Sequence, residues 1–207
     1  MGEVQERFPL FPLAIVCLPG EAVPLHIFEE RYKTMIGECL AERRPFGILW
    51  LGERGLAEVG CTVEITEVLD RMPDGRMNIL VTGRAPFRLL RRIHDLPYPA
   101  GDIELLRDSG GTDPDAARVA RSRYGELLER ASDKPPDETR LAELGAYEMA
   151  ATIDLPPDVK QGLLEERSEG ARMRALAEML GEALRRIELA EMAGERARTN
   201  GKVHHNQ

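Results

Sequence analysis

The sequence predicts an α+β fold, in which an antiparallel, partly closed β-barrel with one inserted helix precedes a C-terminal four-helix subdomain. Turn signals divide the first 108 residues into short apolar or alternating runs that are typical of strands. One segment among them, Glu29 to Arg44, has helical periodicity, and helical spacing returns after Ser109. Because no helix separates most of these strands, we expect antiparallel pairing, and closure of the sheet removes its exposed edges.

The opening of the chain predicts an irregular strand, a strand and a helix. Pro9 and Pro12 interrupt the first apolar run, so we expect any strand there to be short or at an edge. After the turn at Pro19-Gly20, residues 22–28 are expected to be extended. The following helix is indicated by five residues on one face: Tyr32, Met35, Ile36, Cys39 and Leu40.

The next segments predict the remaining strands of the barrel. Residues 46–51 form an apolar run bounded by proline and glycine, as in a buried strand, and residues 98–106 complete the series. Residues 58–82 are predicted to be a hairpin around the turn Met72-Pro73-Asp74-Gly75, and the break in alternation at Val68-Leu69 indicates a bulge or a change of face. Gly83 and Pro86 are expected to interrupt the chain before another strand at 87–93.

The remainder is predicted to be helical. Asp113-Pro114 is an N-cap followed by proline at the first helical position, and a second helix is expected to end near Ile153. A third helix is expected from Leu155 to Leu164, and a fourth carries the apolar stripe Met173 to Ile187. The predicted domains are a barrel over residues 1–108, a helical subdomain over 109–198 and a frayed tail over 199–207.

Composition and charge restrict the class of protein. A content of 43% hydrophobic and 31% charged residues in a chain of 207 residues is ordinary for a soluble globular protein. The net charge is −8, and both halves are acidic, which argues against nucleic acid as a partner. No run approaches the ~20 apolar residues of a membrane span. Cys17, Cys39 and Cys61 form no C-x-x-C pair, so we expect reduced, mostly buried thiols in a cytoplasmic protein.

Motifs of known chemistries do not match this sequence. The string Gly194 to Lys202 has the wrong spacing for a phosphate loop, and Val203 stands where a serine or threonine must bind magnesium. Neither the serines nor the lysines lie in a context typical of a serine–lysine peptidase, and metal-ligand spacing is missing. We therefore predict a protein that is not an enzyme, with no catalytic residue, no metal, no cofactor and no use of ATP.

Several short motifs resemble those of one known family. They are Phe8-Pro9-Leu10-Phe11-Pro12-Leu13, Leu18-Pro19-Gly20, Pro24-Leu25-His26-Ile27-Phe28-Glu29 with Arg31-Tyr32, Pro45-Phe46-Gly47-Ile48, Val59-Gly60-Cys61, Asp74-Gly75-Arg76, Gly83-Arg84 before Phe87-Arg88, and Leu155-Pro156 before Lys160-Gln161 and Leu163-Leu164-Glu165. In number, order and spacing they resemble the N-terminal, substrate-binding domain of Lon proteases over about residues 7–190. Glu30 departs from the pattern, because the family often has proline there.

The resemblance implies a PUA-like pseudo-barrel followed by a helical subdomain, in a stand-alone form that lacks the ATPase and peptidase domains. It also implies recognition of unfolded or degron-bearing polypeptides, with the chain serving as an adaptor for a separate protease or chaperone, or as a holdase-like binder. An extended hydrophobic polypeptide could add a strand to a sheet edge and place apolar side chains in pockets.

The candidate peptide-binding residues lie at the junction of a strand with the first helix and on the apolar strand after that helix. They are Pro24, Leu25, Ile27, Phe28, Phe46, Ile48 and Trp50. The competing interpretation is structural, because apolar residues in such segments commonly pack the core.

Three other functions stay open at this level. PUA-like barrels also occur in RNA-binding proteins, and here RNA would be bound through Arg84, Arg88, Arg91 and Arg92. A regulatory domain would bind a small ligand in a cavity at the barrel mouth. An assembly domain would self-associate through the stripe Met173 to Ile187, although we expect most of that stripe to pack against the barrel.

Overall fold

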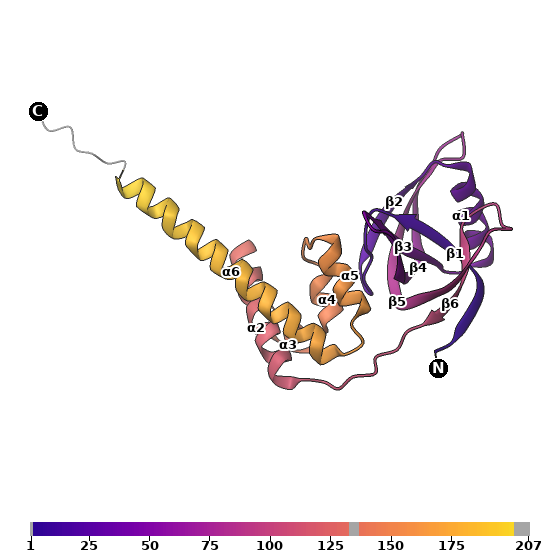
Figure 1. Cartoon of the computed structure of the whole chain (residues 1–207). Coiled ribbons are helices and arrows are strands. Elements are labelled where there is room, and N and C mark those ends of the chain that lie inside the picture. Colours follow the sequence, from indigo (N-terminus) through magenta and orange to yellow (C-terminus); the bar gives the residue numbers. More distant parts are fainter. Residues whose placement is uncertain (1, 133–136, 201–207) are drawn as a thin grey trace, which may run out of the picture. The chain divides into compact units, whose positions relative to one another are not determined.

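The computed structural model describes residues 2–132 and 137–200 (Figure 1). The chain forms two compact units. The first comprises the chain up to Gly111 together with Gly145–Glu169, and the second comprises Thr112–Leu144 and the chain from Gly170 on. All strands belong to the first unit, which also includes part of the predicted helical region.

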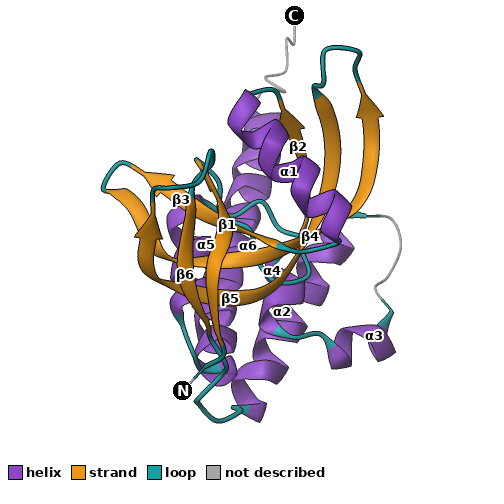
Figure 2. Ribbon diagram, turned by 90° about the vertical axis from the view of Figure 1, so that its right-hand side faces the viewer, coloured by secondary structure: helices purple, strands orange, loops and turns teal. Residues whose placement is uncertain are grey.

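Six strands form one sheet that closes on itself (Figure 2). They are β1 (Val4–Leu13), β2 (Ala22–Ile27), β3 (Phe46–Gly52), β4 (Gly55–Arg71), β5 (Met77–Ile93) and β6 (Ala100–Leu105). The order is β2-β5-β4-β3-β1-β6, and a further pairing of β5 with β6 completes a ring of five strands. The predicted antiparallel sheet is corrected to a mixed one, because β1 and β3 are parallel. The long connection between them, which includes β2 and a helix, permits this crossover.

β1 differs from its prediction. It has ten residues and lies between β3 and β6, so the expectation of a short or edge strand is wrong. Val4–Pro9 pairs with β6, whereas Leu10–Leu13 pairs with β3. Each half of β1 pairs with only one neighbouring strand. A proline, which has no N–H to donate, is therefore accommodated on the side of β1 that does not pair.

The predicted hairpin is confirmed and is longer than expected. β4 and β5 pair along most of their lengths, and their register shifts between Val68 and Asp70, where a bulge or a change of face was predicted. β5 runs through the predicted interruption at Gly83 and Pro86, so the two expected strands are one, but its register with β4 shifts there. The Thr62 hydroxyl takes the place of backbone partners at this point. Its Oγ1 accepts a hydrogen bond from the Ala85 N–H at 3.1 Å and donates one to the Ala85 carbonyl at 3.2 Å.

Helix α1 (Glu30–Glu42) confirms the helical periodicity, since Tyr32, Met35, Ile36 and Cys39 are all buried. Arg43 ends it in the left-handed conformation, with φ of 53°. Inside the ring, a core cluster is formed by Phe8, Leu10, Leu49, Phe87 and Ile103.

Two short helices, α4 (Ala146–Ala150) and α5 (Pro157–Glu165), belong to the same compact unit as the sheet. Gln161 Nε2 of α5 donates to the carbonyl of Val59 on β4 at 3.0 Å. Lys160 Nζ forms an ion pair with Glu21 at 2.5 Å, and both side chains are 14% exposed. Two polar contacts therefore tie α5 to the strand region.

The second unit contains α2 (Pro114–Ala131), α3 (Glu138–Glu143) and nearly all of α6 (Glu169–Asn200). Asp113 caps α2 as predicted, accepting from the Ala116 N–H at 3.0 Å. Asp113 also pairs with Arg174 near the start of α6, and Arg130 pairs with Glu188 further along. These contacts show that α2 and α6 run in parallel.

The predicted four-helix subdomain is not confirmed. The second predicted helix consists of α3 and α4, which fall in different compact units. Of the predicted frayed tail, residues 201–207 lie outside the described residues, whereas Thr199 and Asn200 are the last residues of α6.

The buried hydrogen bond of Gln161 gives a stability prediction. Gln161→Ala leaves the Val59 carbonyl without this donor, so we expect the free energy of unfolding to fall by about 1–3 kcal/mol. Urea unfolding followed by circular dichroism measures it. Gly162→Ala in the same helix is the control: the new Cβ meets open space, and the expected change is a gain of roughly 0.5–1 kcal/mol. An unchanged midpoint for Gln161→Ala would contradict the role of this contact.

The three cysteines are free and buried, as expected. Burial raises the pKa of the Cys39 thiol to about 11, against the opposing effect of Arg44. We expect Cys39 to react with a thiol reagent at neutral pH far more slowly in the native protein than in denaturant, because the thiolate is the reactive form. Mass spectrometry of the labelled peptides measures the two rates. Equal rates would contradict the protected state of this thiol.

Candidate functional site

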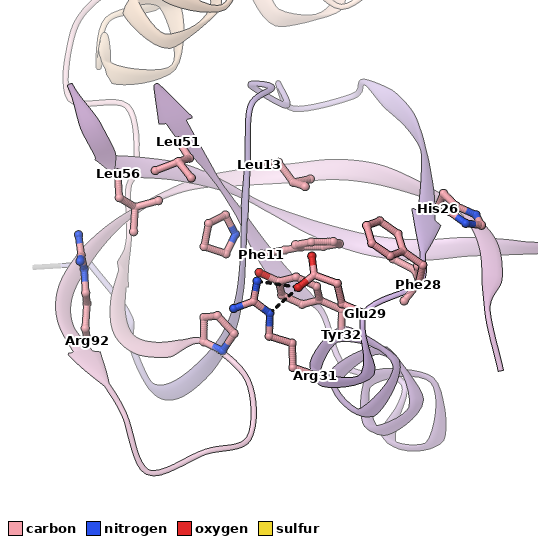
Figure 3. A pocket seen from close by; sticks show the side chains of 13 residues that line it. Phe11, Leu13, His26, Phe28, Glu29, Arg31, Tyr32, Leu51, Leu56 and Arg92 are labelled. Atoms are coloured by element: carbon pink, nitrogen blue, oxygen red, sulfur yellow. Dashed lines mark hydrogen bonds and ion pairs between the residues drawn. The ribbon is translucent and has the colours of Figure 1, made fainter. Parts of the chain in front are cut away.

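The first compact unit carries a hollow of about 600 Å³ where β2 leads into α1 (Figure 3). Nine of its thirteen lining residues are apolar or aromatic: Phe11, Pro12, Leu13, Ile27, Phe28, Tyr32, Leu51, Leu56 and Pro99. The other four are His26, Glu29, Arg31 and Arg92. A mostly apolar hollow of this size suits a few side chains of a ligand, with a small number of polar groups to orient it.

The floor of this hollow is buried and aromatic. Phe11 from β1 and Tyr32 from α1 are both buried, and their ring centroids are 4.1 Å apart. The guanidinium carbon of Arg31 lies 4.6 Å from the centroid of the Tyr32 ring. Burial raises the pKa of Tyr32, partly opposed by Arg31, so its hydroxyl stays neutral at physiological pH.

The rim of the hollow exposes apolar surface. Phe28 is 58% exposed and Leu51 is 51% exposed. The Phe28 ring stacks against the His26 ring at a centroid distance of 5.8 Å. In Figure 3, His26 and Phe28 lie on one side of the hollow, and Leu51, Leu56 and Arg92 lie on the other. Exposed apolar groups gathered around a concavity are typical of binding surfaces.

The polar groups of the hollow are arranged in a simple way. Arg31 and Glu29 neutralise each other, with Nη2 and Oε2 2.7 Å apart. Arg92 is exposed and has no hydrogen-bond or ion-pair partner among residues 2–132 and 137–200. The hollow therefore combines an apolar floor, an internally compensated ion pair and one free cation within the described chain.

Two further hollows adjoin the first at Arg92. One of about 380 Å³ shares Arg31, Leu56 and Arg92 with it and extends along the segment from His94 to Ala100. The other, of about 430 Å³, is lined by Arg7, Arg91, Arg92, Ile93, His94 and Asp95. We call these three adjoining hollows the groove. Arg92 lines all three.

The structure separates the predicted peptide-binding residues into core and surface. The core group comprises Leu25, Ile27, Phe46 and Ile48, with exposures of 8%, 1%, 0% and 1%. Pro24 is exposed on β2, and Trp50 is half-buried on β3, but neither lines the three hollows. Phe28 alone among the seven is both exposed and part of the lining.

Sequence reasoning did not select several lining residues for peptide binding, notably Phe11, Leu51, Leu56 and Arg92, the last of which it considered only for RNA. Leu51 and Leu56 pair across the β3–β4 hairpin, whereas Phe11 of β1 and Arg92 of β5 join them through the pairing of strands that are distant in the sequence. Leu51 had a local signal, because it is an apolar residue at the end of a strand next to a glycine.

The four arginines of the RNA hypothesis are all exposed on β5. Arg84 pairs with Glu64 and Arg91 pairs with Asp102, each at 2.7 Å. Carboxylates thus neutralise two of the four cations. In the part of the chain that the structure describes, no helix is long and apolar enough to cross a membrane, and no cluster of His, Cys, Asp or Glu could hold a metal ion.

A family model described as the ATP-dependent protease La (LON) substrate-binding domain matches residues 7–182. Among curated relatives, the Lon proteases of Roseiflexus castenholzii and Anaeromyxobacter dehalogenans are each 24% identical over 86% of this chain. The matches cover 24% and 23% of those proteins, so the chain spans about a quarter of the length of the curated relatives it matches.

Two solved structures share the fold with a TM-score of 0.64. The Lon N-terminal domain protein of Xanthomonas campestris is 25% identical, and the match covers 82% of this chain and 95% of that one. The N-terminal domain of Mycobacterium avium complex Lon protease is 18% identical, with coverages of 86% and 98%.

Proposed function

Because the chain belongs to the family of Lon substrate-binding domains, we propose that it recognises unfolded or degron-bearing polypeptides through the groove. The family description names a binding role rather than a catalytic one. The observation that carries the proposal is the exposure of Phe28 and Leu51 around a hollow with a buried aromatic floor. In this proposal, the chain binds its clients without ATP, in the cytoplasm.

The energetics of such a site suit a module that inspects many clients. Full burial of one large apolar side chain contributes about 1.5–3 kcal/mol, and ordering an extended peptide offsets part of that gain. Because Phe28 and Leu51 are already half-covered, one engaged peptide side chain gives weak and permissive binding. A weak binder can hold an unfolded chain and then release it to a separate protease or chaperone, as an adaptor or holdase must.

The rival functions have less support from the site. A polar small ligand would need converging unpaired groups, whereas Arg31 and Glu29 already satisfy each other. RNA binding would need unpaired cations that neutralise phosphates and so release the counterions of the RNA. Glu64 and Asp102 already neutralise two of the four arginines on β5.

Binding of fluorescent hydrophobic peptides, measured by anisotropy without ATP, tests the proposal. We expect Phe28→Asp to weaken binding by about tenfold or more, because it removes apolar contact and places an unpaired charge at the rim. Leu69→Asp is the matched control: this leucine is 49% exposed, does not line the groove, and should leave affinity unchanged.

Circular dichroism establishes that both variants fold. Equal affinity of wild type and Phe28→Asp, or an equal loss in both variants, would contradict a binding role for the groove. Suppression of client aggregation at equimolar chain, without ATP, distinguishes a holdase from an adaptor that acts only together with a protease.

A further inference from the structure

Arg92 stands apart from the other cations of the groove. It is the residue common to the three hollows, and its side chain is exposed and has no hydrogen-bond or ion-pair partner within the described residues. The neighbouring arginines each have a carboxylate partner: Arg31 with Glu29, Arg7 with Asp95, and Arg91 with Asp102. Because these carboxylates neutralise the other arginines, Arg92 is the arginine of the described groove whose charge is not neutralised.

This charge has the opposite sign to that of the protein, whose net charge is −8. A guanidinium presents two parallel N–H donors that match the two oxygens of a carboxylate. The backbone and apolar side chains around the groove provide no such partner, and Leu56 and Pro99 are among its neighbours in the lining. The chemistry that complements Arg92 is therefore a carboxylate brought by the ligand.

We propose that the groove recognises a two-part motif: an apolar side chain and a carboxylate on the same extended segment. The apolar side chain packs on the floor of Phe11 and Tyr32 beside Phe28, and the carboxylate pairs with Arg92. This inference rests on the proposed function and adds the side-chain class that the groove selects.

Both parts of the motif face one hollow. Phe28 and Arg92 line the same hollow from opposite sides (Figure 3). In an extended peptide, alternate side chains point the same way, at a rise of roughly 3.3 Å per residue. An even spacing therefore puts the carboxylate on the same side of the segment as the apolar side chain, and an odd spacing directs it away from that side.

Peptides of one length, which differ only as stated, test the motif in four forms. The first carries an aromatic residue with glutamate at an even spacing, tested two and four residues on. The second has glutamine at the same position, and the third has glutamate at an odd spacing. The fourth has glutamine and a free C-terminal carboxylate at the even spacing, with its C-terminal amide as the blank. Affinities for wild type, Arg92→Gln and Arg88→Gln are measured by anisotropy at low and high salt.

Arg88 is the matched control, because it is an exposed β5 arginine without a partner in the described chain and does not line the groove. For wild type and Arg88→Gln, we expect glutamate at the even spacing to bind about fivefold tighter than glutamine at low salt, and less so at high salt. For Arg92→Gln, the preference should vanish. Comparison with the C-terminal form shows whether the side-chain or the terminal carboxylate is read.

The results separate the two proposals. If wild type binds all peptides with equal affinity, and Phe28→Asp lowers the affinity for all of them, the two-part motif is wrong and the binding role of the groove is retained. If Arg88→Gln abolishes the preference as Arg92→Gln does, general attraction replaces the specific pair and the motif is wrong. If no peptide binds wild type better than it binds Phe28→Asp, both the groove and the motif fail.

Discussion

Closure of the sheet through β5 is the constraint on which the first unit depends. This strand of 17 residues pairs with β2 and β4 in its first part and with β4 and β6 in its last part. Such a strand has to bend, and its register shifts provide the bends. Gly83 is required at one of them, since a Cβ there would lie 2.0 Å from the Leu18 carbonyl oxygen. Closure brings Arg92, near the end of β5, into the same hollow as Phe28, which follows β2.

The exposure of Phe28 follows from the same backbone that buries its neighbours. Along β2, Val23, Leu25 and Ile27 are buried, whereas the residues between them are exposed. Phe28 continues this alternation and points outward, although it is the largest apolar residue of the segment. An aromatic ring on the exposed side of a half-buried strand adds nothing to the core, and the proposed function gives this ring a role in binding.

Local patterns predicted local structure well. Period 3.6 predicted α1, alternation and turn residues predicted the β4–β5 hairpin, and the break in alternation at Val68 and Leu69 predicted a bulge or a change of face. Long-range features could not be predicted, because no local signal encodes the parallel pairing of β1 with β3 or the separation of α3 from α4. The site shows the same division. Alternation along β2 distinguishes the exposed Phe28 from the buried Ile27, but the position of Arg92 in the hollow follows only from closure of the sheet.

The charge pattern gives the proposed apolar site a means of discriminating among clients. Apolar contact alone accepts any hydrophobic side chain, since one methylene more or less changes affinity by only about 0.8 kcal/mol. An acidic chain with many carboxylates has paired the arginines around Arg92 but not Arg92 itself. If Arg92 were paired with a carboxylate of the same chain, the groove would be electrically neutral and would not distinguish ligands by their charge. In the proposed motif, the unpaired guanidinium makes a positive charge in the ligand costly and a negative charge favourable, which adds selectivity to a surface that otherwise recognises only hydrophobicity.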